Sequence, residues 1–215
     1  AIRESRHGDD AVHGRAALMS RSNRAAMLLA AVALTLTACS PPPPPFNASE
    51  VSGIAYGKDI GIADTSGQIR RIEDFKDQVT LVFFGFTRCP DVCPSTLMRL
   101  RQVRDALGED ASKLQVLLVS VDPERDTPDR LDAYVKNFDP SFIGLRPEPT
   151  ELEKVVKAFH AIVVKVPTAD GKDYTVDHSA TIYVYDRRNQ LRLIAQPDIA
   201  IDALATDLRR LAQEN

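Results

Sequence analysis

An almost continuous apolar run, Leu81 to Thr87, is the feature that most limits how this chain can fold. A run of this kind is expected of a central strand that is buried on both faces of a sheet. Leu114 to Val121 has the same character. Between the two runs, apolar residues recur at helical spacing up to Gly108, a typical helix end: Leu97, Leu100, Val103 and Leu107. The three segments together predict a strand, a helix and a second strand.

The rest of the chain continues this alternation. Residues 60–72, with a turn at Thr65-Ser66-Gly67, predict an N-terminal hairpin, and residues 181–185 and 191–194 predict a second one. Further helical faces comprise Leu131, Tyr134, Val135 and Phe138; Leu152, Val155, Val156 and Phe159, opened by a Thr150–Glu153 capping box; and Ile201, Leu204, Leu208 and Leu211. This order predicts an α/β domain over residues 51–215, with a thioredoxin-like sheet flanked by helices and an N-terminal β-hairpin extension.

The first fifty residues do not resemble part of a core. We interpret residues 1–18 as translated sequence upstream of a start at Met19, and residues 19–38 as a secretory signal with basic, apolar and small-residue regions. Leu36-Thr37-Ala38-Cys39 resembles a bacterial lipobox, which predicts a lipid on Cys39; an uncleaved signal anchor is the alternative. Residues 39–50 then form a proline-rich linker.

Processing at Cys39 would leave few groups for thiol or soft-metal chemistry. They are Cys89, Cys93, His160 and His178. The net charge of −3 argues against a nucleic-acid partner. Any thiol or soft-metal chemistry must therefore come from those four side chains.

Cys89 and Cys93 directly follow the first apolar run, at the sheet edge where α/β folds place their ligands. The helix that begins here favours thiolates through its N-terminal dipole. Pro90 suits a first helical turn, whereas Pro94 suggests a looser one. A spacing of four residues is short enough for a disulfide or a shared metal.

Three interpretations of the cysteine pair remain open. A structural disulfide suits an oxidising compartment, but so short a loop gains little stability from it. A thiol oxidoreductase usually has two residues between its cysteines, and this chain has three. A metal site of two thiolates and one imidazole is a soft set suited to Cu(I). For the imidazole, His178 precedes a predicted strand near the cysteines, whereas His160 is better explained by the end of a helix.

Three segments together resemble the Sco/SenC family of thioredoxin-like copper proteins. They are Phe83 to Pro94, Ser120 to Pro128, and Asp177-His178-Ser179. The resemblance covers about residues 50–213. It implies a copper site, for Cu(I) or Cu(II), formed by Cys89, Cys93 and His178, and a redox-active cysteine pair whose dithiol binds copper and whose disulfide releases it.

The resemblance also implies a role in assembly of cytochrome c oxidase. The chain would act as a periplasm-facing chaperone that metallates the binuclear copper centre, tethered by a lipid anchor to a bacterial membrane, with the inner membrane favoured. Its partners would be the oxidase subunit that carries that centre, other copper chaperones and thiol reductants. The alternatives are a thiol-disulfide reductase that acts on the cysteines of that centre or on other periplasmic proteins, and a peroxidase that uses Cys89.

Two acidic residues follow the second apolar run. In the family, the acids that match Asp122 and Asp126 are tied to metal loading or to the partner surface. The residues alone suggest a simpler explanation, in which Asp122-Pro123 begins a turn and Asp126 or Thr127 caps the next helix. We favour the simpler explanation for Asp126 and leave Asp122 open as an accessory residue. Met98 fits the helix core better than a ligand role.

Overall fold

The apolar run forms the centre of the sheet, as predicted. Strand β4 (Val79–Gly85) pairs in parallel with β5 (Leu114–Ser120) on one side and antiparallel with β9 (Ile182–Tyr185) on the other. Every residue of β4 and β5 is buried. This double-sided burial explains why the sequence of both strands is almost continuously apolar.

A computed structural model describes residues 44–214 of the chain. The predicted signal, the Cys39 lipid site and residues 39–43 of the predicted linker lie outside the described residues. The six-stranded sheet has the order β1-β10-β9-β4-β5-β6. Its other strands are β1 (Ser49–Glu50), β6 (Ile143–Leu145) and β10 (Leu191–Ala195).

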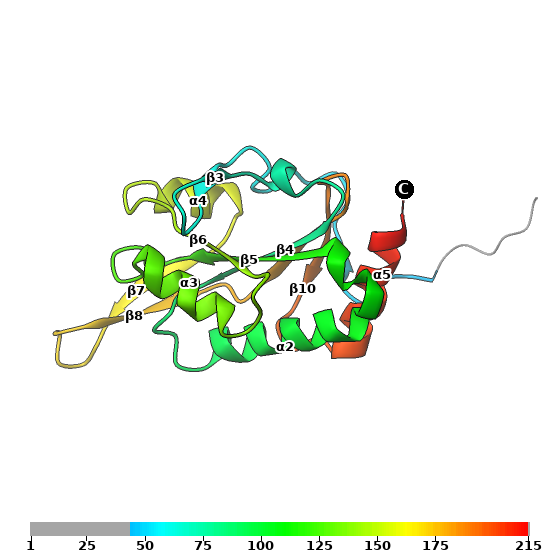
Figure 1. Cartoon of the computed structure of the whole chain (residues 1–215). Coiled ribbons are helices and arrows are strands. Elements are labelled where there is room, and N and C mark those ends of the chain that lie inside the picture. Colours follow the sequence, from blue (N-terminus) through cyan, green and yellow to red (C-terminus); the bar gives the residue numbers. More distant parts are fainter. Residues whose placement is uncertain (1–43, 215) are drawn as a thin grey trace, which may run out of the picture. The chain divides into compact units, whose positions relative to one another are not determined.

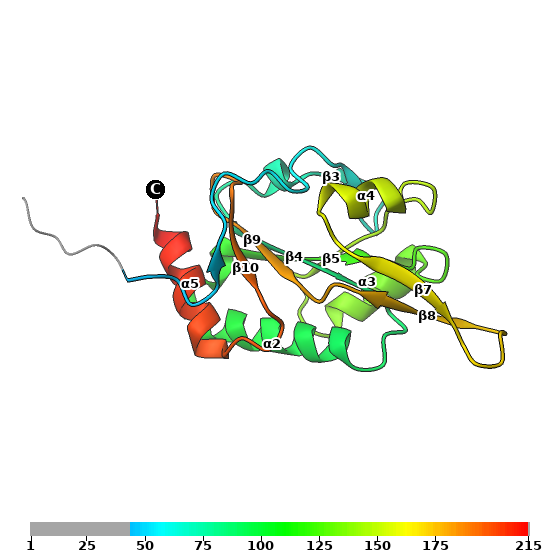
Figure 2. The same cartoon turned by 180° about the vertical axis from the view of Figure 1, so that it is seen from behind.

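Helices cover both faces of this mixed sheet. Figures 1 and 2 show α2, α3 and α5 on one face, and α4 with the hairpin of β2 and β3 on the other. The arrangement agrees with the predicted α/β class and with the predicted N-terminal hairpin. The bounds are β2 (Ile62–Ala63), β3 (Ile69–Arg70), η1 (Ile72–Phe75), α2 (Val92–Leu107), η2 (Gly108–Lys113), α3 (Pro128–Lys136), α4 (Leu152–Ala158) and α5 (Ile201–Gln213).

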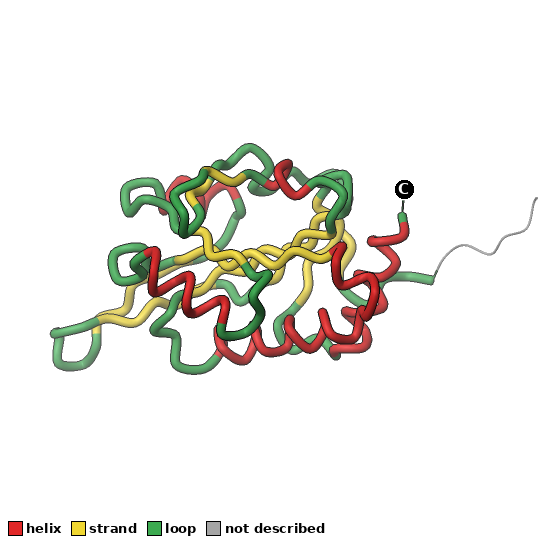
Figure 3. Tube along the Cα trace, viewed as in Figure 1, coloured by secondary structure: helices red, strands yellow, loops and turns green. Residues whose placement is uncertain are grey.

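A further hairpin, which we did not predict, projects from the end of the sheet where β4 and β5 finish (Figure 3). It consists of β7 (Val163–Pro167) and β8 (Tyr174–His178), paired antiparallel. Most of its residues are partly or fully exposed, although Val176 is buried. Because neither strand is covered on both faces, neither shows a continuous apolar run.

Three local expectations differ from the structure. Helix α4 begins after Glu151 without a side-chain cap, and Glu153 pairs with Lys157 instead of closing a capping box. Met98 is 49% exposed on α2, so it does not belong to the helix core. Pro94 lies inside the first turn of α2, where a backbone donor is not needed, so it does not disturb the helix.

A membrane-spanning helix is not found among residues 44–214, because none of their helices is both long enough and apolar enough.

Buried Asp207 on α5 holds the segment that leads into β1. Its carboxylate accepts hydrogen bonds from the backbone amides of Asn47 and Ala48 and from the Asn47 side chain, at 2.8–3.0 Å. We expect Asp207→Ala to lower the free energy of unfolding by about 1–3 kcal/mol, because it leaves the buried amide of Ala48 and the partly buried donors of Asn47 without their acceptor. Denaturant unfolding monitored by circular dichroism measures this. Asp202→Ala, at an exposed position of the same helix, should stay within about 0.5 kcal/mol of wild type.

Candidate metal centre

The turn between β4 and α2 holds the two cysteines in different environments. Cys89 precedes the helix and is partly exposed, whereas Cys93 lies in its first turn and is fully buried. The backbone amide of Cys93 donates to Cys89 Sγ at 3.4 Å. Both cysteines are free thiols. The helix N-terminus therefore offers a backbone donor to the outer sulfur, as the sequence predicted.

Gly85 makes room for the buried sulfur. A Cβ atom at this last residue of β4 would lie 3.0 Å from Cys93 Sγ and 3.0 Å from a methyl carbon of Leu118 on β5. Both contacts are too close for an undisturbed side chain. The absence of a side chain at Gly85 thus lets Cys93 pack directly against the end of the sheet.

His178, the last residue of β8, points its ring at the thiols. Its Nε2 lies 3.4 Å from Cys93 Sγ. Its Nδ1 lies 3.1 Å from the carbonyl oxygen of Ser179, which can only accept, so Nδ1 carries the proton and Nε2 has a free lone pair in the neutral ring. The edges of Phe83 and Phe86 flank the ring, with centroids 6.2 and 6.0 Å away.

Cys89, Cys93 and His178 form the one group of three potential metal ligands found among the described residues. Their ligand atoms all lie within 4.8 Å of one another. The group opens into a pocket of about 330 Å³, bounded by Phe86, Asp91, Val92, Thr175 and Ala180 among others. Two sulfurs and one imidazole at this spacing can hold a soft metal ion.

The thiols have opposite acidities. The pKa of Cys89 is lowered to about 4, chiefly by the hydrogen bond from the Cys93 thiol and further by His178 and by backbone donors, against the effect of partial burial. The pKa of Cys93 is raised, because its proton is held between the two sulfurs and its thiol is buried. At neutral pH the pair therefore carries a thiolate on the exposed sulfur and a proton on the buried one.

The other candidate residues lie outside this group. Asp126 does not cap α3; Thr127 does, and Asp126 points inward, fully buried, to accept from the hydroxyls of Thr87 at 2.6 Å and Ser120 at 2.7 Å. The preference for a capping role at Asp126 was therefore wrong. His160 stacks on Tyr56 with ring centroids 4.3 Å apart, in an exposed position.

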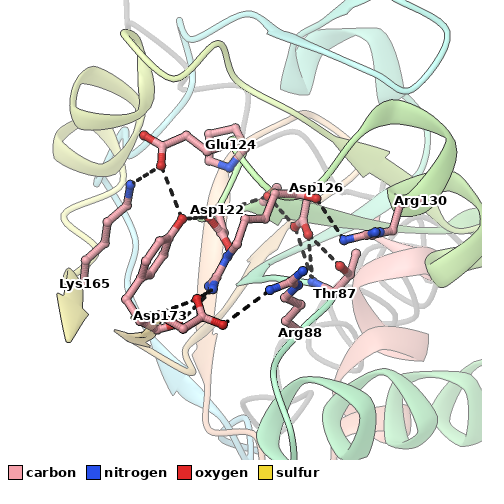
Figure 4. A network of polar contacts seen from close by, with 12 residues as sticks. Thr87, Arg88, Asp122, Glu124, Asp126, Arg130, Lys165 and Asp173 are labelled. Atoms are coloured by element: carbon pink, nitrogen blue, oxygen red, sulfur yellow. Dashed lines mark hydrogen bonds and ion pairs between the residues drawn. The ribbon is translucent and has the colours of Figure 1, made fainter. Parts of the chain in front are cut away.

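Asp122 begins a turn, as expected, but its side chain has a further role. The carboxylate is fully buried, pairs with Arg125 and accepts from the hydroxyl of Tyr174 at 2.7 Å. Figure 4 shows it within a polar network that joins the loop after β5 to the β7–β8 hairpin. Sequence reasoning missed Arg125 and Tyr174. Their spacing of 49 residues gives no local signal of contact; the acid-rich segment around Arg125 was the available hint.

Fold and site together define a thioredoxin-like protein with a Cys-Cys-His group at the end of its central strand. The chain belongs to the SCO1/SenC family, whose sequence pattern matches residues 51–213. The resemblance seen in the sequence is thereby confirmed.

Known relatives and solved structures agree with this assignment. The chain is 31% identical to a SCO2-like protein of Rickettsia prowazekii, over 70% of this chain and 73% of the relative. It spans about half (48%) of the mitochondrial SCO2 homologue of Danio rerio, at 38% identity. Copper-bound ScoI of Bradyrhizobium japonicum is similar at 40% identity and a TM-score of 0.66, over 73% of this chain and 99% of that one. Apo Sco1 of Thermus thermophilus is similar at 37% identity and a TM-score of 0.69, over 78% of this chain and 97% of that one. The thioredoxin-like fold class is therefore confirmed.

The lowered pKa of Cys89 predicts how its reactivity depends on pH. A group with a depressed pKa keeps its charge above that pKa, so the Cys89 thiolate is already formed at pH 6. We expect its alkylation by iodoacetamide in the reduced protein to change less than about twofold from pH 6 to pH 8, whereas an ordinary thiol would speed up about 80-fold. Mass spectrometry of the peptide that carries Cys89 measures the rate. A rise like that of a free thiol would contradict the assignment.

Proposed function

We propose that this chain binds copper through Cys89, Cys93 and His178 and passes it to the binuclear copper centre of cytochrome c oxidase. The observation that carries the proposal is the orientation of His178, because its Nδ1 is engaged by a carbonyl while its Nε2 faces the thiols. An imidazole held in this way is poised as a ligand and not as a surface group.

The chemistry of the three side chains suits copper as a cargo. Thiolate and imidazole are soft or borderline ligands, and a set of three suits Cu(I) better than a structural zinc ion, which usually has four protein ligands. Cys89 already carries a charge, since its pKa is about 4. The partly exposed Cys89 and His178 give access from the pocket, whereas buried Cys93 anchors the site.

The family supports the same proposal. ScoI proteins of Bradyrhizobium japonicum and Arabidopsis thaliana, 40% and 28% identical to this chain, have been solved with copper bound. Sco proteins are cytochrome c oxidase assembly proteins. We extend that role to this chain. Its partners would be the oxidase subunit that carries the copper centre, and copper chaperones or thiol reductants.

We further propose that the domain faces the periplasm of a bacterium, tethered by a lipid on Cys39 to the inner membrane. This rests on the signal-like residues 19–38 and on the lipobox resemblance in the sequence. A proline-rich linker would hold the domain away from the membrane surface.

A thiol-disulfide reductase is the second candidate. The asymmetry of the cysteines favours it, because a partly exposed thiolate at Cys89 beside a buried, protonated Cys93 is the arrangement of an attacking and a resolving thiol. In this role Cys89 would attack a disulfide of the partner, and Cys93 would then displace the reduced partner as a disulfide forms between the two cysteines. His178 would matter little to it.

His178→Ala separates the two candidates. We expect the reduced wild-type protein to bind about one copper ion per chain, and the variant to bind it at least tenfold more weakly. Replacing a residue that orients a metal ligand typically lowers metal affinity about tenfold or more, and removing a ligand should lower it at least as much. Competition with a Cu(I) chelator measures the affinity. X-ray absorption should show nitrogen beside sulfur in wild type and sulfur without that nitrogen in the variant. His160→Ala, at an exposed position outside the site, is the matched control.

Equal copper affinity in wild type and His178→Ala would remove His178 as the third ligand. If both proteins also reduced a disulfide-containing peptide at equal rates, the reductase would replace the chaperone as the favoured function.

A further inference from the structure

The three ligands are held in unequal ways. Cys89 lies between β4 and α2, and Cys93 in the first turn of α2, both next to core elements, whereas His178 lies on the projecting β7–β8 hairpin. An isolated two-stranded hairpin is only marginally stable in water. The imidazole can therefore stay near the sulfurs only if something attaches the hairpin to the rest of the domain.

Arg125, in the loop after β5, makes three kinds of contact that provide this attachment. Its Nε pairs with Asp122. One terminal nitrogen donates to the Asp173 carboxylate and to the Tyr174 carbonyl oxygen, both at 2.8 Å. The guanidinium also lies 3.7 Å from the centre of the Tyr174 ring. One side chain thus joins a buried carboxylate in the loop to the first strand residue of β8.

The same carboxylate is bound from both sides. Asp122 is fully buried, and while Arg125 occupies one of its oxygens, the hydroxyl of Tyr174 donates to the other at 2.7 Å. A buried carboxylate is stable only when it is paired and hydrogen-bonded. The contacts of Asp122 therefore stabilise both the loop after β5 and the β7–β8 hairpin.

Val176 of β8 is buried in the core, but the other ion pairs between the hairpin and the rest of the domain are more exposed. Lys165 pairs with Glu124 at 2.7 Å and Arg88 with Asp173 at 3.6 Å, and the side chains in both pairs are between 41% and 54% exposed. Ion pairs this exposed contribute little stability. The Arg125 side chain is only 14% exposed and its partner Asp122 is fully buried, so this pair is shielded from solvent where the other two are not.

We infer that Arg125 is a positioning residue that locks the β7–β8 hairpin against the loop after β5 and thereby holds His178 at the dithiol. The inference rests on the proposed function for its consequence in copper binding, but the locking itself concerns the protein without metal. Strand β8 transmits the effect, since its register with β7 is continuous from Tyr174 opposite Pro167 to His178 opposite Val163.

Lysine cannot replace arginine here. A planar guanidinium can pair with Asp122, donate to two acceptors on the hairpin and stack on the Tyr174 ring at the same time, whereas an ammonium is a compact point charge. Arg125→Lys should therefore keep the loop folded, because a cation still faces Asp122, yet loosen the hairpin.

The first measurement is amide hydrogen exchange of the full-length protein without copper. We expect Arg125→Met to speed exchange in peptides from residues 162–178 about tenfold, and Arg125→Lys to speed it less, with β4 and β5 unchanged in both. Arg146→Met is the matched control. The Arg146 side chain is 21% exposed and donates to the carbonyls of Pro123 and Asp126 in the same loop, and its ion pair is with Glu148, which lies outside the hairpin. This variant should leave exchange in the hairpin at the wild-type rate.

The second measurement is a double-mutant cycle on copper affinity. Arg125→Lys should weaken Cu(I) binding about tenfold when His178 is present and should have no further effect when His178 is replaced by alanine, because its action passes through that imidazole. X-ray absorption on the copper-loaded Arg125→Lys protein should show a reduced nitrogen contribution with unchanged sulfur. A merely structural role would weaken binding in both backgrounds alike.

Two outcomes overturn the inference. One is wild-type exchange of the hairpin in both Arg125 variants; should Arg125→Met fail to fold, Arg125→Lys decides alone. The other is an Arg125→Lys effect on copper affinity that persists in the His178→Ala background. Failure of the proposed function would be distinct from both outcomes, because wild-type protein would then bind copper without a nitrogen ligand. The exchange measurement would still test whether Arg125 attaches the β7–β8 hairpin.

Discussion

The parallel pairing of β4 with β5 is the constraint on which the rest of the site depends. Its register places Gly85 beside Ser120, so the chain leaves both strands at the same edge of the sheet. The cysteine turn follows one strand and the acidic loop follows the other. Buried Asp126 then joins the two, because it accepts from Thr87 on one side and Ser120 on the other. The cysteine turn is therefore anchored directly to the two fully buried central strands.

Much of this arrangement could be predicted from the sequence, because a strand buried on both faces has an almost continuous apolar run. The runs at Leu81 and Leu114 predicted the two central strands, and the thiols after the first run predicted a site at that edge. The β7–β8 hairpin has no such apolar run, since Val164 and its neighbours face solvent. Its existence is decided by tertiary contacts, which propensity and periodicity do not report.

The polar residues around the site were harder to predict for a related reason. Asp126 has the sequence context of a helix cap, and only the fold shows that Thr127 takes that role while Asp126 faces inward. The pairing of Arg125 with residues of β8 joins segments almost fifty positions apart. The role of a buried charge depends on which groups surround it in three dimensions, and the choice of partner is absent from the local pattern.

Copper binding and thiol exchange draw on the same physical feature of the cysteine pair. A thiolate on partly exposed Cys89, stabilised by Cys93 and by the start of α2, is both a metal ligand and a nucleophile. The sulfurs alone therefore cannot separate the two functions. What distinguishes them is the imidazole, which a reductase does not require and a three-coordinate copper site does. His178 reaches the dithiol through a hairpin that buries one apolar side chain, Val176, in the core and is otherwise fastened by charged and polar contacts, whereas Cys93 is fully buried in the core. The feature that would make this thioredoxin-like domain a copper protein thus depends on polar contacts as well as on the core.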